Sequence, residues 1–69
     1  MKENFTVITM KTKNGKTLYL KEGFGKSLEW TFNKQEAIWF PLVIDAEKCA
    51  KNYFKTFNNY GFETFEYYI

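Results

Sequence analysis

Residues 4–22 read NFTVITMKTKNGKTLYLKE, and this stretch decides the fold. Residues 4–12 are rich in Thr, Val and Ile, which favour a β-strand. The dipeptide Asn14-Gly15 that follows is typical of a two-residue type I′ turn, whose twist matches that of a hairpin. The sequence therefore predicts a β-hairpin in which residues 16–22 form the returning strand.

The two-residue turn also sets a predicted register. It places Met10 opposite Tyr19 and Ile8 opposite Lys21, and directly opposed residues share a face of the sheet. One predicted face is mainly apolar and holds Phe5, Val7, Leu18 and Leu20. The other is mixed and holds Ile8, Met10, Tyr19, Thr6, Thr12 and Lys21. A slip by one residue would exchange the faces of one strand relative to the other.

Three short elements are predicted in addition to the hairpin and to a long helix over residues 45–58. Residues 27–32 alternate between polar and apolar side chains, which predicts a third strand with Leu28, Trp30 and Phe32 on one face. Asn33-Lys34-Gln35-Glu36 approximates a capping box and predicts a short helix that Pro41 ends. Residues 62–69 are rich in aromatic side chains and predict a last strand.

Residues 45–58 predict the longest helix, with Asp45 as its N-cap. Apolar side chains recur there at the helical period and form one stripe: Ala46, Cys49, Ala50, Tyr53, Phe54 and Phe57. Residues 1–69 are therefore expected to form a single α+β domain of order β-β-β-α-α-β. Its four-stranded, mostly antiparallel sheet would carry the long helix on one face.

The chain lacks the residue types that most enzymes and metal sites use. It has no His, which is the usual acid or base near neutral pH, and no base is evident for Ser27 or Cys49. Glu63 and Glu66 would point to opposite faces of their strand, and zinc or calcium ligands are not grouped. We expect a protein that is not an enzyme and holds no metal or cofactor.

Localisation follows from what the sequence lacks. No apolar run approaches the roughly 20 residues that span a bilayer, and residues 1–5 contain no apolar core of a signal peptide. A single cysteine also fits a reducing compartment. The expected location is the cytoplasm, without membrane contact.

Aromatic content points to a contact surface. The 69 residues include eight Phe, five Tyr and two Trp, and a domain of this length buries only about 60% of its unfolded surface. Because one helix covers only one face of the sheet, the mixed face would stay open to a protein partner or a second copy. The predicted partner-binding residues are Ile8, Met10, Tyr19, Lys21, Phe62 and Tyr68.

Charge distribution supports an alternative. Residues 1–26 hold six Lys and two Glu, a net charge of +4, although the whole chain carries only +2. Lysines for phosphates with aromatic rings for stacking would suit sequence-nonspecific binding of nucleic acid. The residues for that alternative are Lys11, Lys13, Lys16, Tyr19, Lys21, Phe24 and Lys26. The absence of Arg and the low net charge weigh against it.

A resemblance to a group of known proteins is carried by two segments: residues 30–40, WTFNKQEAIWF, and residues 46–50, AEKCA. In this pattern the chain resembles small phage and prophage proteins of low-GC Gram-positive bacteria, which show a hairpin, a Trp-Thr strand, a short helix and an Ala-rich helix. The resemblance implies a protein that binds and blocks a host protein, such as a component of antiviral defence. The shared positions are those of a core, so no functional residue carries over.

Overall fold

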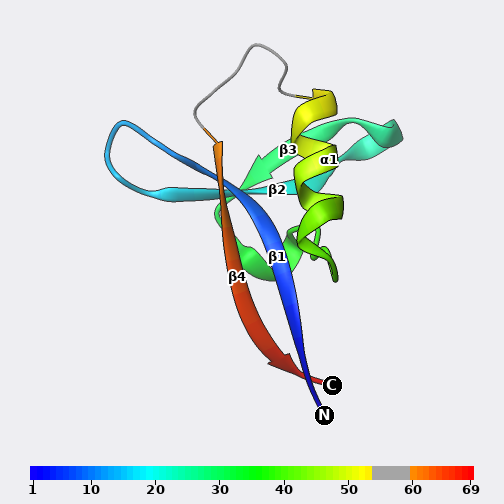
Figure 1. The fold of residues 1–69 in the computed structure, drawn as a ribbon. Helices are drawn as coiled ribbons and strands as arrows, with labels where there is room; N and C mark the ends of the chain where they lie inside the picture. Colours follow the sequence, from blue (N-terminus) through cyan, green and yellow to red (C-terminus); the bar gives the residue numbers. More distant parts are fainter. Residues whose placement is uncertain (54–59) are drawn as a thin grey trace.

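The computed structural model describes residues 1–53 and 60–69, and they form an α+β fold (Figure 1). The strands are β1 (Lys2–Lys11), β2 (Thr17–Glu22), β3 (Leu28–Thr31) and β4 (Tyr60–Tyr68). They form one antiparallel sheet in the order β3-β2-β1-β4. Helix α1 (Val43–Tyr53) and two 3₁₀ turns, η1 (Phe24–Lys26) and η2 (Lys34–Glu36), complete the described elements. The four-stranded sheet with one long helix confirms the predicted class.

The hairpin loop is one residue longer than predicted, and this moves the register. Thr12 N donates to Lys16 O at 2.8 Å, and Gly15 N donates to Thr12 O at 3.0 Å. Gly15 has a φ of +81°, as in a three-residue loop that ends in a left-handed residue. Thr9 therefore lies opposite Tyr19 and Met10 opposite Leu18, so the predicted type I′ turn and its register were wrong.

The shifted register redistributes the two faces. Ile8 and Met10 share their face with Leu18 and Leu20, which is the face that α1 covers. Tyr19 lies on the opposite face, because it is directly opposed to Thr9. The predicted grouping of Ile8 and Met10 with Tyr19 on an open face was therefore wrong.

Gly15 offers a direct test of the loop. A Cβ atom at this position would meet nothing within 4 Å, so replacement by alanine introduces no clash. The left-handed backbone alone disfavours alanine, and we expect Gly15→Ala to lower the free energy of unfolding by about 1 kcal/mol. Gly15→Asn should cost less, because Asn tolerates this conformation. Urea unfolding of the two variants measures the difference, and equal costs would contradict the loop geometry.

Residues 38–40 form an extended segment that lies between β1 and β2 where these two strands separate. Ile38 N donates to Leu20 O at 3.0 Å, and Thr6 and Phe40 exchange two backbone hydrogen bonds of 2.8 Å. The segment thereby satisfies backbone groups that the parting strands would leave unpaired. Because side chains alternate along it, Phe40 packs on the core beneath α1 and Trp39 lies on the other side of the sheet.

The predicted short helix over residues 33–40 is only the 3₁₀ turn η2. Asn33 caps it as expected, since its Oδ1 accepts from Gln35 N at 3.0 Å. Glu36 does not complete the capping box, because its carboxylate accepts from Thr31 Oγ1 at 2.8 Å. The chain must leave the turn early to reach the gap between β1 and β2, so the described residues contain one α-helix and not two.

Helix α1 begins at Val43, two residues earlier than predicted. Leu42 O accepts hydrogen bonds from Asp45 N at 3.1 Å and Ala46 N at 3.4 Å, which places Asp45 in the first turn and not at the N-cap. Ala46 and Ala50 are fully buried as the apolar stripe predicted. Tyr53 is exposed, and the predicted stripe residues Phe54 and Phe57 lie outside the described residues.

The core lies between α1 and the sheet. Its fully buried members are Ile8, Leu20, Ala46 and Ala50. Partly buried apolar side chains pack around them, namely Leu28, Trp30, Phe40, Cys49 and Tyr60. Phe32 was predicted on this face but is 64% exposed, because β3 ends at Thr31 and the chain turns away. The small side chains of Ala46 and Ala50 let α1 pack closely on β1.

Candidate protein-binding edge

Strand β4 is the outermost strand on one side of the sheet and pairs only with β1 among the described strands. The pairing runs without interruption from Lys2 opposite Tyr68 to Met10 opposite Tyr60. The two chain ends meet at the end of this ladder, where Ile69 N donates to Met1 O at 2.9 Å. β4 therefore has one edge paired along its whole length and one edge without a described neighbour.

Hydrogen bonds at two places fix which residues of β4 face outward. The bond from Ile69 to Met1 marks a hydrogen-bonded pair, so odd-numbered residues of β4 direct their backbone groups toward β1. Thr6 uses its backbone groups for Phe40 on the other edge of β1, which agrees with this alternation. The backbone N–H and C=O groups of the intervening residues point away from β1, and those residues include Phe62, Thr64, Glu66 and Tyr68.

The side chains of these four residues are also exposed. Phe62 is 42% exposed and Tyr68 is 69% exposed, and Thr64 and Glu66 are exposed between them. Helix α1 packs on β1 and lies beyond it from β4 in Figure 1. We call the outward backbone groups and side chains of Phe62, Thr64, Glu66 and Tyr68 the β4 edge.

Apart from the charge of Glu66, the β4 edge lacks the features by which exposed strand edges avoid pairing. Such edges are usually short, or carry Lys, Pro or a bulge. The other outer strand, β3, has only 4 residues. β4 has 9 residues, contains neither Lys nor Pro, and pairs with β1 in an unbroken register. A long edge of this kind is a template on which another strand can add.

Charges on β4 are compensated within the chain. Glu66 lies 3.6 Å from Lys2 Nζ, and Glu63 accepts from Lys34 Nζ at 2.8 Å on the opposite face. Lys2 Nζ also lies 5.3 Å from the centre of the Tyr68 ring. The Lys2–Glu66 pair is exposed and the Lys34–Glu63 pair is only partly buried, so each contributes about 1 kcal/mol or less to stability. Their main effect is to lower the repulsion that an acidic strand would present to a second one.

An aromatic cluster supports β4 on the face away from α1. The Trp39 ring lies 5.5 Å from Phe5, 5.0 Å from Phe65 and 4.9 Å from Tyr67, measured between ring centres. Trp39 Nε1 donates to Lys34 O at 2.9 Å, and Lys34 Nζ lies 3.9 Å from the centre of the Phe65 ring. The sequence interpretation missed this role of Trp39, because the residue lay in an expected helix. The alternation of Phe65 and Tyr67 on one face was the available clue.

The structure separates the six predicted partner-binding residues. Phe62 and Tyr68 belong to the β4 edge, and Phe62 is paired directly with Ile8. Ile8 is fully buried beneath α1, and Met10 is partly buried on the same face. Tyr19 and Lys21 lie on the opposite face, where Lys21 Nζ is 3.9 Å from Glu29. The predicted residues therefore do not form one continuous surface.

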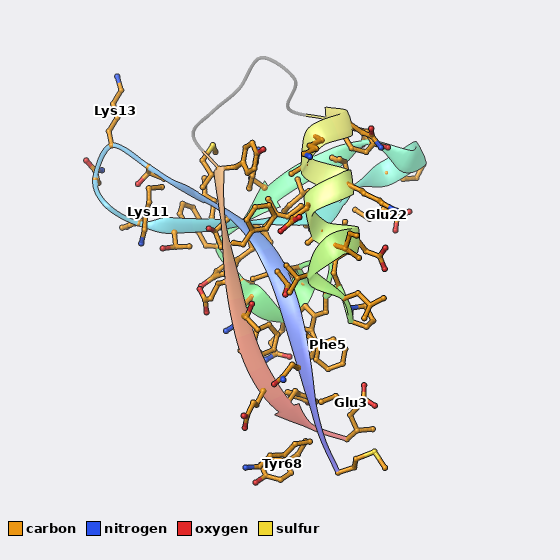
Figure 2. The ribbon with its side chains drawn as sticks, viewed as in Figure 1. Glu3, Phe5, Lys11, Lys13, Glu22 and Tyr68 are labelled. Carbon is orange, nitrogen blue, oxygen red and sulfur yellow. The ribbon has the colours of Figure 1, made fainter. Side chains whose placement is uncertain are left out.

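The residues of the nucleic-acid alternative are also dispersed. Lys11, Tyr19 and Lys21 share the face away from α1, and Lys11 Nζ donates to Thr17 Oγ1 at 2.6 Å. Lys13 extends from the tip of the hairpin in Figure 2. Three further members lie elsewhere: Lys16 is 6.0 Å from the Phe32 ring, Phe24 is 97% exposed on η1, and the Lys26 side chain lies outside the described part. Nucleic-acid binding stays a hypothesis that this arrangement favours less than strand pairing.

Groups with chemical reactivity are not assembled in the described residues. No three or more metal-binding side chains come together there, and no pocket forms among them. Partial burial raises the pKa of the Cys49 thiol above its usual value, which disfavours the reactive thiolate near neutral pH. Within residues 1–53 and 60–69, no helix has the length and apolar character needed to cross a membrane.

Comparisons of the chain with protein-family models, with curated proteins and with solved structures found no match. The β4 edge is a candidate contact site on geometric grounds. Its backbone groups have a defined direction, its side chains are exposed, and its charges are compensated.

Proposed function

We propose that the chain is a small non-catalytic module that binds another protein chain by adding a strand of that chain to the β4 edge. The observation that carries the proposal is the row of outward backbone groups at Phe62, Thr64, Glu66 and Tyr68, beside exposed aromatic rings. Strand addition takes affinity from main-chain hydrogen bonds and specificity from alternate side chains. Both are present on the same strand.

Main-chain hydrogen bonds and aromatic rings are expected to contribute different amounts to the free energy of binding. Each hydrogen bond of the added strand contributes about 0.5–1.5 kcal/mol net, because water is displaced from the same groups. Complete burial of a fully exposed apolar side chain contributes about 1.5–3 kcal/mol, and Phe62 and Tyr68 can gain the part of this that corresponds to their exposed 42% and 69%. Main-chain bonds therefore supply orientation and part of the affinity, and the rings decide how tightly a particular strand is held.

A biological setting for the proposal comes from the resemblance carried by residues 30–40 and 46–50. In small phage proteins of that kind, binding to a host protein blocks the activity of the host protein. We extend the proposal to such a target: a host protein with an accessible strand or an extended segment. By occupying that segment, the module would inhibit without chemistry of its own.

Proline at position 66 tests the proposal, because the Glu66 N–H points outward and makes no bond to β1. Glu66→Pro removes this donor from the middle of the edge and leaves the inner ladder complete. We expect binding of a partner to weaken about tenfold or more, since an unmatched acceptor costs about 1–3 kcal/mol at the interface. The measurement is affinity capture from the host with tagged variants, quantified by mass spectrometry.

Glu66→Gln is the matched control, because it removes the same charge and the ion pair with Lys2 but keeps the N–H. Its captured proteins should match those of the unmodified chain. Far-UV circular dichroism establishes that both variants fold. Equal capture by Glu66→Pro and the unmodified chain would show that the partner does not bind at the β4 edge.

A further inference from the structure

We infer that the β4 edge binds a second copy of this chain, whose own β4 pairs with it antiparallel about a two-fold axis at Thr64. The inference rests on the proposed function, because it uses the same edge, and a second copy would compete there with a strand of a host protein. The two sheets would then join through β4 into one continuous sheet. Both copies would satisfy their outward backbone groups with the identical groups of the other copy.

The direction of the backbone groups permits this pairing. The outward residues Phe62, Thr64, Glu66 and Tyr68 lie two apart, which is the spacing of hydrogen-bonded pairs in an antiparallel ladder. A two-fold axis at Thr64 makes this residue its own partner and places Phe62 opposite Glu66 of the second copy. Thr64 is also the central residue of β4 (Tyr60–Tyr68), so this axis gives the longest overlap of the two strands.

Charge selects among the possible axes. An axis at Glu63 or Glu66 would place identical carboxylates directly opposite each other, which is destabilising. An axis at Thr64 places Glu63 opposite Phe65 and Glu66 opposite Phe62, so no like charges meet. Each glutamate already has a lysine of its own chain nearby, Lys34 at 2.8 Å and Lys2 at 3.6 Å.

Apolar surface gives the pairing its driving force. The side chains of Phe62 and Tyr68 are exposed in the single chain, on the same face of the sheet as α1, which packs on β1. Pairing brings Phe62 of each copy beside the strand of the other and shields part of both rings. A domain of this size buries only about 60% of its unfolded surface, so additional burial has a large relative effect on its stability.

Reciprocal charges at position 64 test the axis. Thr64→Lys places two lysines at the axis and Thr64→Glu two glutamates, and each variant alone is expected to dimerise at least tenfold more weakly than the unmodified chain. An equimolar mixture should recover the dimer, because Lys then faces Glu. Thr64→Val should stay dimeric, and it controls for loss of the 3.2 Å hydrogen bond between the Thr64 and Thr6 hydroxyl groups.

Light scattering after size-exclusion chromatography, over a concentration series of the full chain, measures the mass of each species. A dimer for the unmodified chain, lost in both charged variants and restored by their mixture, supports the inference. A monomer at every concentration overturns it, as does a Thr64→Lys variant that stays as dimeric as Thr64→Val. If the chain is monomeric but captures a different protein, and the Glu66→Pro variant no longer captures it, the inference fails and the proposed function is supported.

Discussion

Replacement of Ile8 by alanine is expected to lower the free energy of unfolding by about 2–5 kcal/mol, the usual cost for a buried aliphatic side chain. Ile8 is fully buried and packs with Leu20, Ala46 and Ala50 beneath the helix. The alanines are too small to move into the space that the substitution leaves. A domain near 70 residues rarely has more than about 3–5 kcal/mol of stability, so much of the variant should be unfolded at 37 °C.

Urea unfolding followed by far-UV circular dichroism measures this loss, and Phe32→Ala is the matched control. Phe32 is 64% exposed, and its replacement should change the free energy of unfolding by less than about 0.5 kcal/mol. With the two-residue turn that Asn14-Gly15 favours, Ile8 would instead lie on the open face, and its replacement would cost as little as that of an exposed side chain. A larger loss for Phe32→Ala than for Ile8→Ala would therefore contradict the observed register.

Periodic patterns predicted most of the fold. The spacing of Ala46 and Ala50 placed both on the buried side of the helix, and alternation placed Leu28 and Trp30 on the covered face of the sheet. The aromatic stretch at residues 62–69 predicted a last strand, and β4 (Tyr60–Tyr68) is present there, paired with β1. Such patterns extend over many residues, so a local irregularity does not erase them.

Local loop geometry was not predictable from the same patterns. Asn-Gly suits a two-residue turn, but the glycine also suits the left-handed position of a three-residue loop, and Gly15 takes the second role. Because the loop is one residue longer, Tyr19 lies on the opposite face of the sheet from Ile8. The predicted contact surface, which needed both residues on one open face, therefore does not form. Tertiary contacts decide between the two loops, because only the observed register puts both Ile8 and Leu20 under the helix.

The candidate site depended on strand order, which the sequence left open. Phe62 and Tyr68 were among the predicted partner-binding residues, but their place at an open edge follows from β4 being the outermost strand of the described sheet. The insertion of residues 38–40 between β1 and β2 was not predicted. Pro41 can end either a helix or an extended segment, and the sequence pattern before it was interpreted as a helix. That insertion places Trp39 against Phe65 and Tyr67 of β4, on the face of the sheet away from α1.

Replacement of Trp39 by alanine is expected to cost about 3 kcal/mol, the lower end of the range for large aromatic residues because the ring is only partly buried. The indole ring contacts Phe5, Phe65 and Tyr67 and holds two strands and the inserted segment together. Its loss should loosen β4 in particular. Amide exchange should therefore accelerate most at Phe65 and Tyr67, whose N–H groups point toward β1.

Two control substitutions separate the roles of the Trp39 ring and its N–H group. Trp39→Phe keeps an aromatic ring but removes the Nε1–H that donates to Lys34 O, so it should cost about 1 kcal/mol in addition to a small packing loss. Phe24→Ala removes a ring that is 97% exposed and should have almost no effect. If Trp39→Ala were as stable as Phe24→Ala, the aromatic cluster would not support β4, and the rigidity that strand addition requires would have another source.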